Sequence, residues 1–156
     1  MKILNPESAQ EIFRRYYALL KYFKRVLVTV PLASFPHKNF FFSLRNLKSL
    51  LPSSIVSNAI LSFKSRVEFI QRATGFSFPE AVKVVNVKKL SRNILVPHWD
   101  IIFLDKGLSV KCPDGVIFLR TEKPLVNASL ILLKQTKFSE FELKVLRTHN
   151  QRSLSA

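Results

Sequence analysis

The sequence predicts an α+β fold, because helical and strand patterns occupy different halves of the chain. In the first half, apolar residues at helical spacing alternate with two short β-branched runs, an α/β-like order that predicts helices around a parallel strand pair. In the second half, short apolar segments separated by turn residues predict β-hairpins and one short helix. We expect one small mixed sheet flanked by helices, in a single domain over residues 1–147 with a basic polar tail over 148–156.

The first helix is predicted to begin at Asn5-Pro6-Glu7. These residues place a capping side chain, a proline of the first turn and an acid near the positive end of the helix dipole in the usual order. The helix should end near Arg25. The run Val26–Val30 then predicts a short buried strand, since β-branched residues favour strands and Pro31 closes it. The apolar residues at helical spacing are Ile12, Phe13, Tyr16, Leu19, Leu20 and Phe23.

Two further helices and a second strand are predicted before residue 75. An amphipathic helix follows His37-Lys38-Asn39 and ends at Pro52, because proline cannot continue a helix. Ser54–Ser57 is predicted to be a strand parallel to the first one. Asn58 is placed to cap a third helix that runs to about Arg72.

The second half of the chain predicts mainly strands. Pro79–Leu90 fits a helix, but its four valines equally favour a strand. Turn residues at 105–107 and 112–115 separate three short strands, and Leu125–Leu133 forms a fourth. Ser139-Glu140-Phe141-Glu142 matches a capping box and predicts a final helix to about Arg147. The three short strands are Ile101–Leu104, Leu108–Lys111 and Val116–Arg120.

Charge is the strongest functional signal in the sequence. Twenty-five Lys and Arg stand against ten Asp and Glu, so the net charge is +15. The chain is also 47% hydrophobic, which distinguishes it from a disordered basic tail. A folded polycation of this size predicts a large polyanionic partner, with nucleic acid first and an anionic membrane surface second.

The candidate RNA-binding residues are long cations without acidic neighbours, as phosphate contacts require. The sequence has neither an RNP-type aromatic motif nor a KH-type GxxG loop, so we expect contacts to shape and backbone to dominate. Tyr16-Tyr17 and Phe40-Phe41-Phe42 could stack on unpaired bases, but aromatics at helical apolar spacing belong mostly to the core. The candidate cations are Arg14, Arg15, Lys38, Arg45, Lys48, Lys64 and Arg66.

The sequence offers few residues for catalysis, and we expect no enzyme, no cofactor, no metal site and no small-molecule substrate. The three histidines are far apart, Gly-rich phosphate loops are absent, and a single cysteine excludes a Cys-based zinc site. An enzyme, the least favoured alternative, would use His98, Asp100 and Cys112. We also expect no transmembrane segment, because no apolar run reaches the length of about 18 residues that a span needs.

Several segments occur in an order found in a known protein family. They are VLVTV (Val26–Val30), FSLRNLKSLL (Phe42–Leu51), SIVSN (Ser54–Asn58), AILSFKSRVE (Ala59–Glu68) and LVNASLILLKQTKFSEFELKVL (Leu125–Leu146). Together they resemble the RNA-binding domain of the ribosomal stalk-base proteins, the L-ten or P-zero family. That family carries a Leu-Arg pair on its second helix, here Leu44-Arg45, and a Val-x-Asn element, which adds Asn58 to the candidate RNA contacts. Ser57 stands where the family usually has a basic residue.

The resemblance implies a shortened organellar form of this family. The expected function is that of a structural constituent of a mitochondrial ribosome in the matrix, with large-subunit rRNA and neighbouring ribosomal proteins as partners. The A/T-rich residue usage fits an organelle-encoded gene. Two alternatives are a small-subunit ribosomal protein and a membrane-surface or respiratory-complex accessory protein that lays its basic first helix on anionic lipid.

Overall fold

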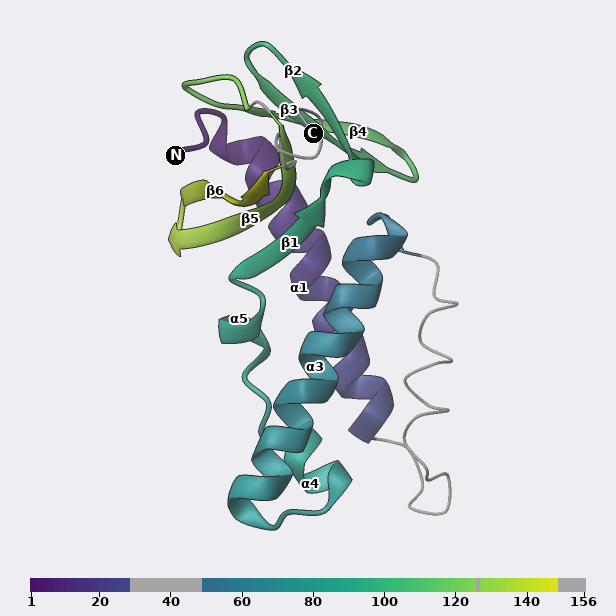
Figure 1. Cartoon of the computed structure of the whole chain (residues 1–156). Coiled ribbons are helices and arrows are strands. Elements are labelled where there is room, and N and C mark those ends of the chain that lie inside the picture. Colours follow the sequence, from purple (N-terminus) through teal and green to yellow (C-terminus); the bar gives the residue numbers. More distant parts are fainter. Residues whose placement is uncertain (29–48, 126, 149–156) are drawn as a thin grey trace, which may run out of the picture. The chain divides into compact units, whose positions relative to one another are not determined.

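The computed structural model describes residues 1–28, 49–125 and 127–148, and within them the protein is α+β, as the sequence predicts (Figure 1). The helices are α1 (Pro6–Val28), α3 (Ser53–Thr74), α4 (Phe78–Lys83) and α5 (Val87–Leu90), with the 3-10 helix η3 (His98–Asp100). The strands are β1 (Asn93–Pro97), β2 (Ile101–Leu104), β3 (Gly107–Cys112), β4 (Gly115–Arg120), β5 (Ala128–Lys137) and β6 (Glu140–Thr148).

The contacts within the chain define two compact units. The helical unit is Arg14–Ser91, and the β unit combines Met1–Phe13 with Arg92–Ala156. Helix α1 contributes to both, because the boundary falls after Phe13. Whether the two units fold together as the single domain expected for residues 1–147 stays a prediction.

The helical unit is built on α3 and on α1 beyond Arg14. The Phe23 ring of α1 meets the Phe63 ring of α3 edge to face, with centroids 6.1 Å apart and an interplanar angle of 85°. Gly75 ends α3 in the left-handed conformation with φ 76°, and its N–H donates to the Gln71 carbonyl at 2.8 Å. The buried side chains at helical spacing are Tyr16, Leu19, Leu20, Phe23 and Leu27 on α1, and Ile55, Val56, Ala59, Ile60, Phe63 and Val67 on α3.

Two short helices follow α3, and each has a side-chain cap. The Ser77 hydroxyl accepts from the Glu80 N–H at 3.4 Å and donates to the Glu80 carboxylate at 3.0 Å, so Ser77 caps the start of α4. The Asn86 side chain accepts from the Lys89 N–H at 3.0 Å and so begins α5. The connection between α4 and α5 is short. The Val84 N–H holds its first end by donating to the Ala81 carbonyl at 3.3 Å, and Asn86 holds the other end.

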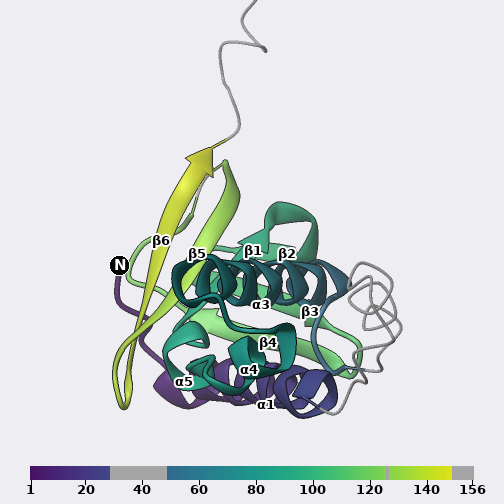
Figure 2. The same ribbon diagram turned by 90° about the horizontal axis from the view of Figure 1, so that it is seen from below.

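The β unit contains two three-stranded antiparallel sheets, in the orders β1-β5-β6 and β2-β3-β4. Strands β5 and β6 form a long twisted pair (Figure 2). In the second sheet, two-residue turns join β2 to β3 and β3 to β4. Gly107 at the first turn has φ 151°, and a Cβ there would overlap the Leu119 carbonyl oxygen, so this position requires glycine.

The first five residues connect both sheets of the β unit. The Ile3 N–H donates to the Phe141 carbonyl of β6 at 3.0 Å, and the Leu4 N–H donates to the Arg120 carbonyl of β4 at 2.8 Å. The Asn5 side chain accepts from the Arg120 N–H at 2.7 Å. At the start of α1, the Phe13 ring lies 5.2 Å from the Phe141 ring between centroids. The N-terminal segment is therefore part of the β unit.

Both strands predicted in the first half are wrong where the structure describes them. Val26, Leu27 and Val28 form the last turn of α1, because buried Leu27 continues the stripe of Phe23 and a β-branched residue costs a helix only about half a kcal/mol. Ser54–Ser57 lies in α3, which begins directly after Pro52, and Asn58 is an interior residue instead of a cap. Residues 29–48, with the predicted second helix from Lys38, lie outside the described residues.

The other strand and helix predictions had mixed outcomes. The three hairpin strands at 101–120 are confirmed as β2, β3 and β4, and the strand beginning at Leu125 corresponds to β5. The ambiguous segment Pro79–Leu90 forms α4 and α5. The final helix is wrong, because Ser139 lies in a hairpin turn and Phe141 and Leu143 alternate as buried residues of β6. The expected single mixed sheet is instead two antiparallel sheets.

Candidate nucleic-acid interface

The two units carry very different charge. The helical unit contains fourteen Lys and Arg and only two acids, Glu68 and Glu80, whereas the β unit contains eleven Lys and Arg and eight acids. The net charges are therefore +12 and +3, which account for the total of +15. Between Glu11 and Glu68 the sequence has no acidic residue at all. The positive potential is thus concentrated in one unit instead of being spread along the chain.

The structure describes five of the eight predicted RNA-binding residues, on two helices of the helical unit. Arg14 and Arg66 are exposed, on α1 and α3 respectively. Half-buried Arg15 donates from Nη1 to the Leu50 carbonyl at 2.9 Å, so this cation also holds the chain just before α3. Lys38, Arg45 and Lys48 lie outside the described residues.

The remaining two predicted residues lie within α3. Lys64 is 4.0 Å from Glu68 one turn later, an exposed helical pair of small energetic value. Asn58 is half-buried inside the helix. Arg66 lies over the Phe69 ring, with its Cζ 5.3 Å from the ring centroid. The five described residues therefore lie on two helices, α1 and α3.

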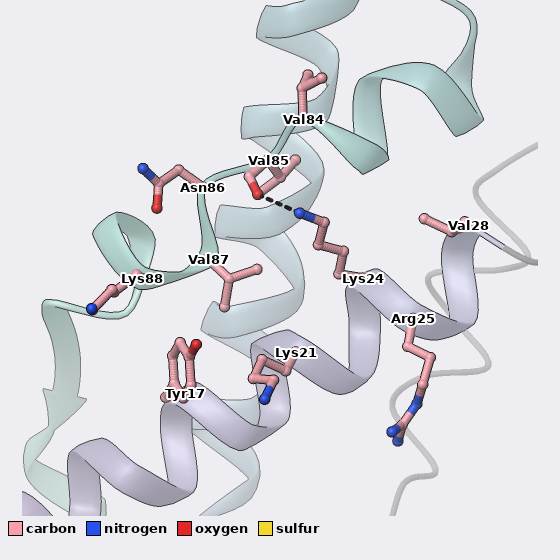
Figure 3. Close-up of a pocket in the computed structure, with 10 residues that line it drawn as sticks. All are labelled: Tyr17, Lys21, Lys24, Arg25, Val28, Val84, Val85, Asn86, Val87 and Lys88. Carbon is pink, nitrogen blue, oxygen red and sulfur yellow. Dashed lines mark hydrogen bonds between the residues drawn. The ribbon is translucent and has the colours of Figure 1, made fainter.

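An open cleft in the helical unit contains residues that sequence reasoning did not select. It has a volume of about 770 Å³ and lies between the C-terminal half of α1 and the α4–α5 connection (Figure 3). Helix α1 contributes Tyr17, Lys21, Lys24, Arg25 and Val28, and the connection contributes residues 84–88. Four of these ten lining residues are Lys or Arg, and none of the ten is acidic. The cleft is therefore a cationic hollow in the more basic unit.

The side chains of the cleft have defined contacts. The Lys24 ammonium donates to the Val85 carbonyl at 3.0 Å, which ties the α4–α5 connection to α1 (Figure 3). The Lys21 Nζ lies 5.4 Å from the centroid of the Tyr17 ring. Arg25 and Lys88 extend outward on opposite sides in Figure 3. The arrangement offers cations, one aromatic ring and valine side chains to a ligand.

Only part of this cleft could have been recognised in the sequence. The cluster Lys21, Lys24 and Arg25 is visible on the first helix as an acid-free group of cations. Nothing in the segment Val84–Lys88 indicates that it lies next to the first helix. The two segments are about 60 residues apart in the sequence, and patterns of neighbouring residues do not reveal contacts over such a separation. The Tyr16-Tyr17 pair is also visible in the sequence as a possible stacking element, and the exposed fraction of Tyr17, 36%, is consistent with that role.

The residues of the enzyme alternative lie in the β unit. His98 and Asp100 belong to η3 and not to a strand, and the His98 Nδ1 lies 3.4 Å from the Ser129 carbonyl oxygen. Burial raises the pKa of Asp100, and the charge of nearby Lys111 acts in the opposite direction. Cys112 is half-buried at the end of β3. Among the described residues, no group of three or more His, Cys, Asp or Glu is placed to hold a metal ion.

Comparisons with protein-family models, with curated proteins and with solved structures found no match for the chain. Within the part of the chain that the structure describes, no helix has the length and apolar character needed to cross a membrane.

Proposed function

We propose that the protein is a non-catalytic RNA-binding protein of a ribonucleoprotein particle and that it binds through its helical unit. The observation that carries this proposal is the excess of fourteen cations over two acids in that unit. Nucleic acid is the polyanion best suited to such a surface, because each phosphate contact releases condensed counterions and so favours binding. The near balance of charge in the β unit supports a separate, mainly structural role for that unit.

The particle that we propose is the mitochondrial ribosome, with large-subunit rRNA as the ligand and neighbouring ribosomal proteins as further contacts. This finer proposal rests on the sequence resemblance to the stalk-base family. Two segments quoted for that resemblance, Val26–Val28 and Ser54–Asn58, are helical in the structure. The charge of the helical unit favours RNA whatever the conformation of those segments. The choice of the large subunit depends on the resemblance.

The proposal is tested by removing equal charge from each unit of the full-length protein. Binding to transcripts of mitochondrial large- and small-subunit rRNA would be measured across a range of salt concentrations. The helical-unit variant should lose about tenfold or more in affinity, and its salt dependence should flatten by about 0.7–0.9 for each phosphate contact removed. The four exposed positions changed to Gln are Arg14, Arg66, Arg72 and Lys89 in one variant, and Lys106, Lys123, Lys144 and Arg147 in its matched control.

The control variant in the β unit should bind within about twofold of the wild type, because the same charge is removed away from the proposed surface. Equal losses for both variants would contradict the assignment to the helical unit. Binding to anionic vesicles without binding to either RNA would overturn the proposal in favour of a membrane surface. Stronger binding to the small-subunit transcript would overturn the choice of subunit alone. Sedimentation with the large subunit, abolished by nuclease, would support it.

A further inference from the structure

The cleft in the helical unit differs from a purely cationic surface because it also offers apolar and aromatic groups. The Tyr17 ring and the Val84 side chain are exposed, with fractions of 36% and 54%. Both are lining residues of the cleft: Tyr17 lies beside Lys21 at one end, and Val84 lies at the other end, beyond Val85 (Figure 3). An exposed aromatic ring next to cations favours a ligand that has both a negatively charged part and a flat apolar part.

The two chemical parts of an RNA nucleotide match this combination. A duplex presents mainly phosphates and sugars on its outside, and its bases are stacked against one another, so cations alone would suffice to hold it. An unpaired nucleotide adds the face of its base, which stacks on aromatic rings irrespective of sequence. Resting on the proposed RNA-binding function, we propose that this cleft binds one unpaired nucleotide, with its base against Tyr17 and its phosphate beside Lys21 and Lys24.

The contacts of the cleft support this division of roles. The Lys21 ammonium lies over the Tyr17 ring, 5.4 Å from its centroid, so it must leave this face for a base to stack there, and it then has the phosphate of the same nucleotide within reach. The Lys24 ammonium already donates one hydrogen bond to the Val85 carbonyl, at 3.0 Å. Since an ammonium has three donors, Lys24 can hold the connection in place and still donate to a phosphate oxygen.

The size of the cleft is sufficient for this ligand. Its volume of about 770 Å³ lies within the range of about 300–1,000 Å³ that small-molecule sites occupy. The buried side chains of Val85 and Val87 form apolar lining from the connection. Hydrogen bonds hold the connection at its two ends: the Val84 N–H donates to the Ala81 carbonyl, and the Asn86 side chain accepts from the Lys89 N–H.

The test compares single-stranded and duplex RNA with the full-length protein. The single strand would have about twelve nucleotides without self-complementarity, a length within the site sizes of single-strand binders, and the duplex would have the same length. Tyr17→Leu should weaken single-strand binding about tenfold and duplex binding less than about twofold. Tyr17→Phe, which keeps the ring, should bind as the wild type does. Trp99→Leu, which removes an exposed aromatic side chain from the β unit, is the matched control and should leave both affinities unchanged.

Photo-crosslinking provides a second measurement that does not depend on a substitution. A single strand containing 4-thiouridine should crosslink to the peptide with Tyr17 or to the peptide with residues 84–88. If the wild type binds RNA but Tyr17→Leu binds single strands equally well, or if crosslinks fall only outside these peptides, the cleft assignment is wrong and the RNA-binding function stands. If the wild type binds neither single-stranded nor duplex RNA, both proposals fail.

Discussion

The helical unit and the β unit use acidic residues differently. In the β unit, Lys134 faces Glu142 and Lys137 faces Glu140 across the β5–β6 pair. Opposite charges directly across two strands stabilise a sheet. In the helical unit, the two acids are Glu68, beside Lys64, and Glu80, whose carboxylate accepts from the Ser77 hydroxyl at the start of α4. These four acids therefore lie beside cations or at the start of a helix, and the helical unit still has twelve more cations than acids.

The two units also differ in what they expose. The sheet β2-β3-β4 presents apolar side chains to solvent at Ile102, Leu104, Val116 and Phe118. Residues 98–120 of that region carry three basic and three acidic side chains, so their net charge is zero. The helical unit also exposes apolar side chains, among them Leu61, Phe69 and Phe76, but it adds an excess of cations and a basic hollow. The net charge of the whole chain, +15, therefore hides the difference between the units, which carry +12 and +3. The position of the charge indicates the binding surface better than its total does.

The largest expected effect comes from removing one buried ring in each unit. Phe63→Ala and Phe141→Ala should each lower the free energy of unfolding by about 3–5 kcal/mol, because each side chain is fully buried against a second phenylalanine. Urea denaturation measures the loss. Amide hydrogen exchange should then increase mainly in α3 for Phe63→Ala and mainly in β5 and β6 for Phe141→Ala. Identical exchange patterns in both variants would show that the two units unfold together and would remove the distinction between them.

The next effect is a loss of stability at high pH that originates in the helical unit. Burial raises the pKa of Tyr16 to about 12, and a hydrogen bond with Ser62 partly opposes that rise. Between pH 10 and pH 12 the unfolded chain therefore loses this proton while the folded protein keeps it, so stability falls as pH rises, by about 2–3 kcal/mol. Urea denaturation at both ends of this range measures the loss. In Tyr16→Phe the loss should be smaller by that amount, and an unchanged loss would contradict the assignment.

The smallest expected effect concerns the hydrogen bond between Lys24 and the Val85 carbonyl. Lys24→Met keeps the length and the apolar part of the side chain but removes the donor, so stability should fall by about 1 kcal/mol. Lys21→Met is the matched control, because Lys21 only lies near the Tyr17 ring, and it should cost about 0.5 kcal/mol or less. Equal stabilities of the two variants in urea would mean that this bond does not hold the cleft.

The parts of the fold that were predicted correctly depend on local signals. The hairpins of β2, β3 and β4 follow from short apolar segments with turn residues between them, and the start of α1 follows from Pro6 and Glu7. The Asn5 side chain, which was predicted to cap this helix, bonds instead to the Phe118 and Arg120 backbone of β4. The α+β class followed from these same patterns. In each case the residues that determine the structure lie within a few positions of one another.

The incorrect predictions share a different cause. Ser139–Arg147 has both a capping box and an alternating pattern, and the choice between helix and strand depends on the partner strand β5, which buries Phe141 and Leu143. Ile55 and Val56 favour a strand by propensity, but they lie on the buried face of α3 in the tertiary structure. Local propensity amounts to about a kcal/mol or less per residue, and burial of a large side chain outweighs it.

The candidate site also has one part that local sequence reveals and one part that it does not. The sequence by itself determined the excess of cations, its acid-free stretch and the presence of Lys21, Lys24 and Arg25 on one helix. Only the tertiary structure decided that residues 84–88 lie across from them and form a cleft with Tyr17. Charge is a sum over residues and can be counted in the sequence, whereas a cleft requires two segments brought together by the burial of side chains elsewhere in the unit.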